Sequence, residues 1–120
     1  FKDGFDGQHP DKVKALSYYK RAALLGYAES ATCAGSMLYC GFEGQARDFP
    51  EALKFYKIAT DLGHGEGAYR AAMMFYNGFE EHSPNFSQAL KFFEIATDLG
   101  HSESDHYAKF LRRQGFTAGT

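Results

Sequence analysis

The sequence lacks an apolar run of the roughly 18 residues that a membrane-spanning helix needs, and it has no signal-peptide pattern. It also has little net charge: thirteen basic residues face fifteen acidic ones, giving −2 at pH 7. We therefore expect no direct membrane insertion and no broad electrostatic surface for nucleic acid. The 120 residues suffice for one ordinary domain. Because the chain opens at Phe1 without an initiator methionine, we expect a segment of a longer protein, whose compartment is left open.

Cysteine is scarce as well, with only Cys33 and Cys40 present. Seven residues along one helix separate two Cα atoms by about 10.5 Å, which is beyond the roughly 7 Å limit for a disulfide. We expect free thiols that fill space as small buried hydrophobes. Free thiols weakly favour a reducing compartment.

Catalytic and cofactor patterns are missing too. The histidines and cysteines do not have zinc-ligand spacing, and no nucleophile lies in a recognisable elbow, so we expect no metal, cofactor or enzyme activity. The stretch GHGEG at 63–67 is glycine-rich like a phosphate-binding loop, but it follows no strand and would set Glu66 against the phosphate. We favour an architectural role for it.

What the sequence does have is an internal repeat. Residues 52–64 and 89–101 are 37 positions apart and agree at eleven of thirteen places. The same period extends over the chain and predicts units at 10–46, 47–83 and 84–120, with 1–9 as the tail of a preceding unit.

Each unit is predicted to contain two helices. Asp48 with Glu51, and Asn85 with Gln88, are capping-box pairs that mark helix starts. Glycines at 26, 63 and 100 mark helix ends, where the left-handed conformation is needed. The first helices are expected near 12–25, 49–62 and 86–99, and the second near 29–40, 66–77 and 103–114.

The apolar residues of these helices recur with helical spacing, and no stretch alternates with the period of a strand. A pair of such short helices cannot bury its apolar stripe alone, so neighbouring units must stack. The predicted fold is all-α: a right-handed α-solenoid of antiparallel helix pairs in three 37-residue repeats. The small and aromatic slots of the second unit are Ala52, Phe55, Tyr56, Ala59, Gly63, Ala68, Ala72, Tyr76 and Gly78.

With these slots, the chain resembles the Sel-one-like repeat (SLR) family, a relative of the tetratricopeptide repeat. The first unit fits the same pattern, and the resemblance covers nearly all of the chain. It implies a non-enzymatic scaffold or adaptor that binds other proteins or peptide segments, as a fragment or accessory subunit of a larger protein or assembly.

The resemblance places partner binding on the concave side, along the first helices. Equivalent residues there form three rows, one per helical turn. An exposed isoleucine between charges suits a peptide-binding groove, whereas an isoleucine at the rim of the core is the alternative for Ile58 and Ile95. The rows are Ser17, Lys54 and Lys91; Arg21, Ile58 and Ile95; and Leu24, Asp61 and Asp98.

The last helix breaks the pattern, because four small or aromatic slots become charged. A polar outer helix is typical of the end of a solenoid, so a C-terminal cap is one interpretation. The other is a docking edge for an acidic partner, made by Tyr107, Leu111, Arg112 and Arg113. Met73 and Met74 have a similar pair of interpretations, as an adaptable binding surface or as core filling.

Three further possibilities remain. Asn85 lies in a glycan acceptor sequon, although it also caps a helix. A hydrolase activity is linked to cysteine-rich SLR proteins, but Cys33 and Cys40 cannot bridge each other. RNA binding, by analogy with other helical repeats, would need a basic groove that this charge balance does not favour.

Overall fold

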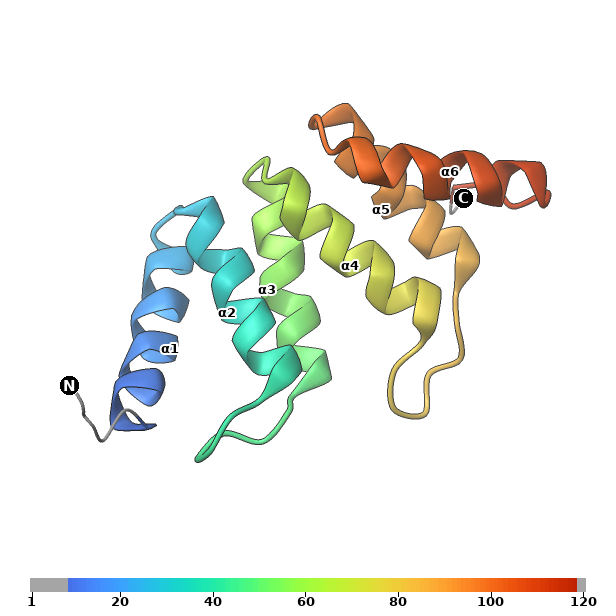
Figure 1. Cartoon of the computed structure of the whole chain (residues 1–120). Coiled ribbons are helices and arrows are strands. Elements are labelled where there is room, and N and C mark those ends of the chain that lie inside the picture. The colour runs from blue at the N-terminus through green and yellow to red at the C-terminus, as the bar shows by residue number, and fades with distance from the viewer. Residues whose placement is uncertain (1–8, 119–120) are drawn as a thin grey trace.

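The computed structural model describes residues 9–118 and, within them, six helices arranged as consecutive antiparallel pairs (Figure 1). In this part of the chain the only β-type pairings are two isolated bridges in the long loops, Phe42 to Gln45 and Phe79 to His82. The prediction for residues 1–8 lies outside the described residues, and His9 is the first residue of α1. The helices are α1 His9–Leu24, α2 Ala28–Cys40, α3 Phe49–Asp61, α4 Gly65–Asn77, α5 Phe86–Asp98 and α6 Ser102–Arg113.

Helix boundaries lie where the capping signals predicted them. The side chain of Asp48 accepts a hydrogen bond from the backbone N–H of Glu51 at 3.1 Å, and Asn85 does the same for Gln88 at 3.1 Å. At the other end of α3, Gly63 has a φ of +88°, a value that strains any residue with a Cβ. The same two signals recur in α5, so the repeated sequence builds a repeated helix.

Consecutive helices pack against one another from α1 to α6, and α1 also touches α3, as α2 touches α4. Figure 1 shows the pairs following one another along the molecule, each rotated relative to the one before. The extents of 51 × 29 × 21 Å are those of an elongated body. The solenoid of stacked helix pairs is confirmed.

The core consists of alanines alternating with aromatic rings. Phe93 of α5 is fully buried and stacks on Tyr107 of α6, with ring centroids 4.8 Å apart and planes 7° apart. Tyr69 and Tyr76 of α4 lie beside this stacked pair, with centroids 6.2 and 6.0 Å from that of Phe93 and 6.3 and 5.3 Å from that of Tyr107. Burying one such ring contributes roughly 1.5–3 kcal/mol. Ten fully buried alanines of the described residues let the helices come close enough for these contacts: Ala31, Ala34, Ala52, Ala59, Ala68, Ala71, Ala72, Ala89, Ala96 and Ala108.

Two helical glycines mark still closer contacts. A Cβ added to Gly67 would lie 2.5 Å from the Cβ of Ala59 on α3 and 2.8 Å from Oγ1 of Thr32 on α2. A Cβ at Gly35 would lie 2.6 Å from the ring of Tyr56. Gly67 thus sits where α2, α3 and α4 meet, and the absence of a side chain there sets how closely two units approach.

One prediction about the core was wrong. Cys33 and Cys40 are free thiols, but both are exposed instead of buried. Their positions fall on the side of α2 that no neighbouring helix covers, whereas Ala31, Ala34 and Leu38 take the buried side.

Replacing Gly67 with alanine is expected to lower the free energy of unfolding by about 1–3 kcal/mol, because the new methyl group collides with Ala59 and Thr32. This steric cost outweighs the roughly 0.5–1 kcal/mol by which alanine stabilises a helix relative to glycine. Chemical denaturation measures it. Gly65→Ala is the matched control: its Cβ would meet Leu99 at an ordinary 3.4 Å, so no loss is expected. Equal stability of the Gly67→Ala variant and the wild type would contradict the close approach.

Asn85→Ala is expected to destabilise the chain by about 0.5–2 kcal/mol, because a helix N–H loses its acceptor. Asn85→Asp keeps a side-chain oxygen at the same place and is expected to retain most of the stability. Thermal unfolding of the two variants side by side checks the cap. If both melt at the same temperature, the Asn85 side chain does not act as one.

Candidate partner-binding surfaces

The predicted rows of the first helices are largely at the surface. Ser17, Lys54 and Lys91 are exposed, and so are Arg21, Leu24, Asp61 and Asp98. Ile58 and Ile95 are half-buried and pack against the core cluster. Their position matches the alternative of an isoleucine at the rim of the core, so the exposed part of the rows is mainly polar.

The two lysines of the first row are held near the rings that follow them. Nζ of Lys54 lies 5.6 Å from the ring centroid of Phe55, and Nζ of Lys91 lies 5.9 Å from that of Phe92. Such cation–π contacts contribute about 0.5–1 kcal/mol at exposed sites. Equivalent charges therefore occupy equivalent places on α3 and α5.

The predicted docking edge of α6 is wrong for Leu111. That side chain is 1% exposed because it packs into the core against α5, and Tyr107 is half-buried on Phe93. Arg112 donates from Nε to Oε2 of Glu94 at 2.9 Å, which ties it to α5. Arg113, the last of the four predicted residues, is exposed and makes no ion pair within residues 9–118.

A different surface, which the sequence reasoning missed, lies on the second helices. A pocket of about 200 Å³ opens between the end of α2 and α4. Buried Tyr56 lies at its base, and Met74, the better buried of the two methionines, also contributes. The pocket is lined by Tyr39, Tyr56, Tyr69, Arg70, Met73, Met74 and Asn77.

The same pocket recurs one unit later, between α4 and α6. Its volume is about 230 Å³. Each of its residues stands 37 positions after a residue of the first pocket, so the pocket is a property of the repeat. The lining is Tyr76, His106, Tyr107 and Phe110. We call the two pockets together the second-helix groove. The recurring tyrosine of Tyr39 and Tyr76 was a signal for it in the sequence.

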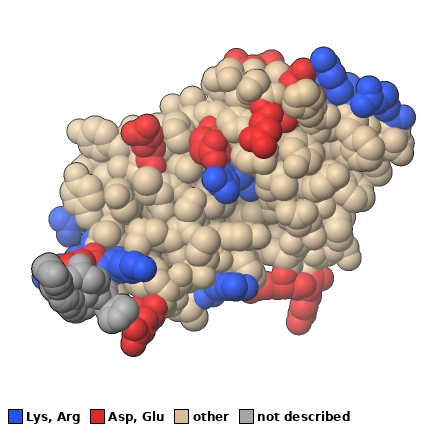
Figure 2. Space-filling model, in the orientation of Figure 1, with Lys and Arg blue, Asp and Glu red and all other residues tan. Residues whose placement is uncertain are grey.

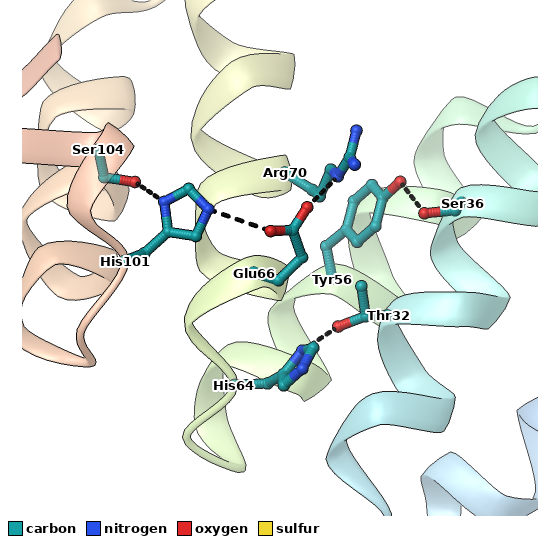
Figure 3. A network of polar contacts seen from close by, with 8 residues as sticks. All are labelled: Thr32, Ser36, Tyr56, His64, Glu66, Arg70, His101 and Ser104. Atoms are coloured by element: carbon teal, nitrogen blue, oxygen red, sulfur yellow. Dashed lines mark hydrogen bonds and ion pairs between the residues drawn. The ribbon is translucent and has the colours of Figure 1, made fainter. Parts of the chain in front are cut away.

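Polar side chains connect neighbouring units beside this groove (Figure 3). Nε2 of His101 lies 3.0 Å from Oε1 of Glu66, and Nδ1 lies 3.0 Å from Oγ of Ser104. The His101 ring also stacks on Tyr69, with centroids 4.4 Å apart. In the preceding unit, His64 is hydrogen-bonded to Thr32 at 2.7 Å. The repeated Gly-His step thus serves unit-to-unit contacts, a role its sequence did not reveal.

Tyr56 anchors the base of the first pocket. Its hydroxyl is hydrogen-bonded to Oγ of Ser36 at 3.1 Å. Burial raises the pKa of Tyr56, while the Ser36 hydrogen bond and the charge of Arg70 act in the opposite direction. The hydroxyl therefore stays neutral at physiological pH and can accept or donate within the pocket.

Charge and metal chemistry add little to the surface. The face drawn in Figure 2 carries acidic and basic side chains interspersed, without a large area of one sign. Within residues 9–118, no three His, Cys, Asp or Glu side chains are grouped so as to hold a metal ion. No helix of this described part is long and apolar enough to cross a membrane.

Comparison with solved structures gives a match to the crystal structure of a protective antigen present in uropathogenic Escherichia coli strains, which displays an SLR fold. The TM-score is 0.74 at 19% sequence identity, over 85% of this chain. The chain spans 22% of the length of that protein, and at this identity the likeness shows the fold alone. No curated protein matches the sequence.

The family model for the Sel1 repeat matches residues 2–27, 30–64 and 65–101, which is most of the chain. The second matched range begins at the third residue of α2 and includes all of α3, so the family frames its repeat from a second helix onward. The unit boundaries at 46/47 and 83/84 remain a prediction, as does the capping role of α6. Sel1 repeats are generally protein–protein interaction scaffolds, and the fold is typically non-catalytic. With three matched repeats in six stacked helices, the chain belongs to the Sel1 repeat family.

Proposed function

We propose that this chain is a non-enzymatic adaptor that binds other proteins or peptide segments, and that it works as part of a larger protein or assembly. The observation that carries this is the repetition of exposed side chains at equivalent places on successive units. A periodic surface can follow an extended partner, since each unit presents the same kind of contact one step further on.

The first-helix rows are the proposed contact surface for such a partner. Lys54 and Lys91 give two equivalent cations, and Asp61 and Asp98 give two equivalent anions two turns further along each helix. A partner with charges of both signs in a matching order would bind these rows in one register. The half-buried edges of Ile58 and Ile95 lie between the charges and would add apolar contact.

Support for an adaptor over an enzyme comes from how the polar groups are used. Glu66 is hydrogen-bonded to His101 and Tyr56 to Ser36 between units, and His101 is also hydrogen-bonded to Ser104 within its own unit. These contacts order the stack, as expected of a structural role. The thiols of Cys33 and Cys40, the feature that would point toward the cysteine-rich hydrolase-linked members, are unpaired on α2.

The test is a charge reversal of the rows. Proteins captured by the tagged chain from an extract of its own cells are quantified by mass spectrometry for the wild type and for Lys54→Glu/Lys91→Glu. We expect at least a tenfold loss of the specific partners, because each reversal replaces an attraction with a repulsion. Both lysines are exposed, so the fold is expected to survive, as circular dichroism will show.

The control is Lys12→Glu/Lys14→Glu, which reverses two exposed lysines of α1 outside the rows. It is expected to retain the partners. Equal capture by the row variant and the wild type would contradict the assignment of the rows. Equal loss in both variants would mean that overall charge, and not the rows, governs binding.

A further inference from the structure

The second-helix groove combines apolar walls with one cation. In its first pocket, Tyr39 is 37% exposed and Tyr69 and Met73 are half-buried, so ring and thioether surface is open to a ligand. The only charged residue in the lining is Arg70. A pocket of this kind suits a ligand that carries both an apolar group and an anionic group, because each group finds a matching part of the lining.

Arg70 has unused hydrogen-bonding capacity. Its Nε donates to Oε2 of Glu66 at 2.7 Å, and Glu66 is the only acceptor that it reaches within residues 9–118. A guanidinium has five N–H donors, so the two terminal NH₂ groups remain for a ligand. Figure 3 shows the guanidinium extending past Glu66 on the side of Tyr56. Paired terminal N–H groups are the geometry that a carboxylate binds in bidentate fashion.

The carboxylate of Glu66 has two partners and occupies only the Nε edge of the Arg70 guanidinium. Oε2 accepts from Arg70, whereas Oε1 faces Nε2 of His101 at 3.0 Å. The pair also fixes the direction of the Arg70 side chain, since one edge of the guanidinium is held on α4. A fixed and half-exposed guanidinium loses less conformational entropy on binding than a mobile lysine would.

The second pocket has no lysine or arginine in its lining and supplies an aromatic site. The position of Arg70 is occupied there by Tyr107, and that of Met73 by Phe110, which is 44% exposed. Together with Tyr76 these rings form walls that suit an aromatic or large aliphatic side chain. The two pockets thus differ in the ligand that each prefers, although the repeat gives them the same shape.

Spacing along α4 links the two pockets. Arg70 and Tyr76 are six residues apart on this helix, which is about 9 Å along its axis. Three residues of an extended peptide span about 10 Å. Tyr69 of the first pocket and Tyr107 of the second also lie next to each other, with ring centroids 6.3 Å apart, so a single short segment can reach both pockets.

We propose that the second-helix groove binds a peptide segment of a partner protein that carries an acidic side chain and, three residues away, an aromatic one. The carboxylate binds the terminal nitrogens of Arg70, and the ring lies between Tyr76, Tyr107 and Phe110. This inference rests on the proposed adaptor function and deepens it by naming the kind of peptide that one surface binds. Because the groove lies on the second helices, the first-helix rows remain open to another partner.

The experiment titrates the full chain into fluorescein-labelled synthetic peptides and follows fluorescence anisotropy. The probes carry glutamate and phenylalanine separated by two alanines, in both orders, with matched peptides in which glutamine or lysine replaces glutamate. We expect one order of the glutamate peptide to bind about tenfold more tightly than its glutamine counterpart, the size of a charge-assisted hydrogen bond. The lysine peptide is expected to bind more weakly still.

Variants assign the effect to the groove. Arg70→Gln is expected to abolish the preference for glutamate over glutamine, and Phe110→Ala is expected to weaken both peptides several-fold. Arg113→Gln, at an exposed arginine outside both pockets, is the matched control and is expected to bind like the wild type. Amide NMR spectra establish that each variant is folded and, in the titration, whether shifts fall on α4 and α6.

Equal binding of the glutamate and glutamine peptides, tighter binding of the lysine peptide, or no binding at millimolar concentration would overturn the proposal. The outcome is separate from that of the capture experiment. Loss of partners in the first-helix variant does not test Arg70. Absence of peptide binding to the groove would overturn this inference and would not contradict the adaptor function.

Discussion

The structure depends on the contact between small residues of one helix and aromatic rings of the next. Gly67 lets α4 come within a side chain's width of Ala59, and buried Phe93 packs with the tyrosines of α4 and with Tyr107 of α6 in one cluster of rings. Dispersion and apolar burial fall off steeply when such surfaces separate, so a single misplaced methyl group disturbs the whole interface. The repeat is retained in the sequence because every unit must present the same interface to its neighbour.

Most of the fold could be predicted because its signals are local. Asp48 and Asn85 cap helices through contacts three residues away, and Gly63 ends a helix through its own φ. The 37-residue period then predicts that the units stack, and this prediction needs no distances between residues. The burial of Cys33 was predicted wrongly because a small apolar residue fits either side of a helix, and only the neighbouring helices decide which side is covered.

The candidate site was much less predictable, because it depends on pairs of residues from different units. Leu111 looked available in a helix with many charges, yet it is the residue that closes the core at the last unit. The groove was missed for the same reason: Tyr39 and Arg70 are 31 positions apart, and nothing in either helix alone shows that they share a pocket. His101 likewise meets Glu66 only because the units stack in register.

For an adaptor, the useful consequence is that the fully buried and the fully exposed residues of each unit have separate roles, while Tyr69, Tyr76 and Tyr107 contribute to both the core and the groove. Alanines, glycines and rings hold the units at a fixed spacing, so the residues between them are free to vary. That arrangement explains how Arg70 and Tyr107 can occupy equivalent places in equally well packed units. It also means that binding specificity can change along the stack without loss of the fold.

The measurement that tests the packing most directly is a proton NOE between the ring of Phe93 on α5 and the ring of Tyr76 on α4, which belong to different units, on an assigned spectrum of the full chain. We expect a strong cross-peak, together with NOEs from the Phe93 ring to the Tyr107 ring. Sharp, assigned resonances at these residues without such cross-peaks would contradict the stacking of units that every other conclusion uses.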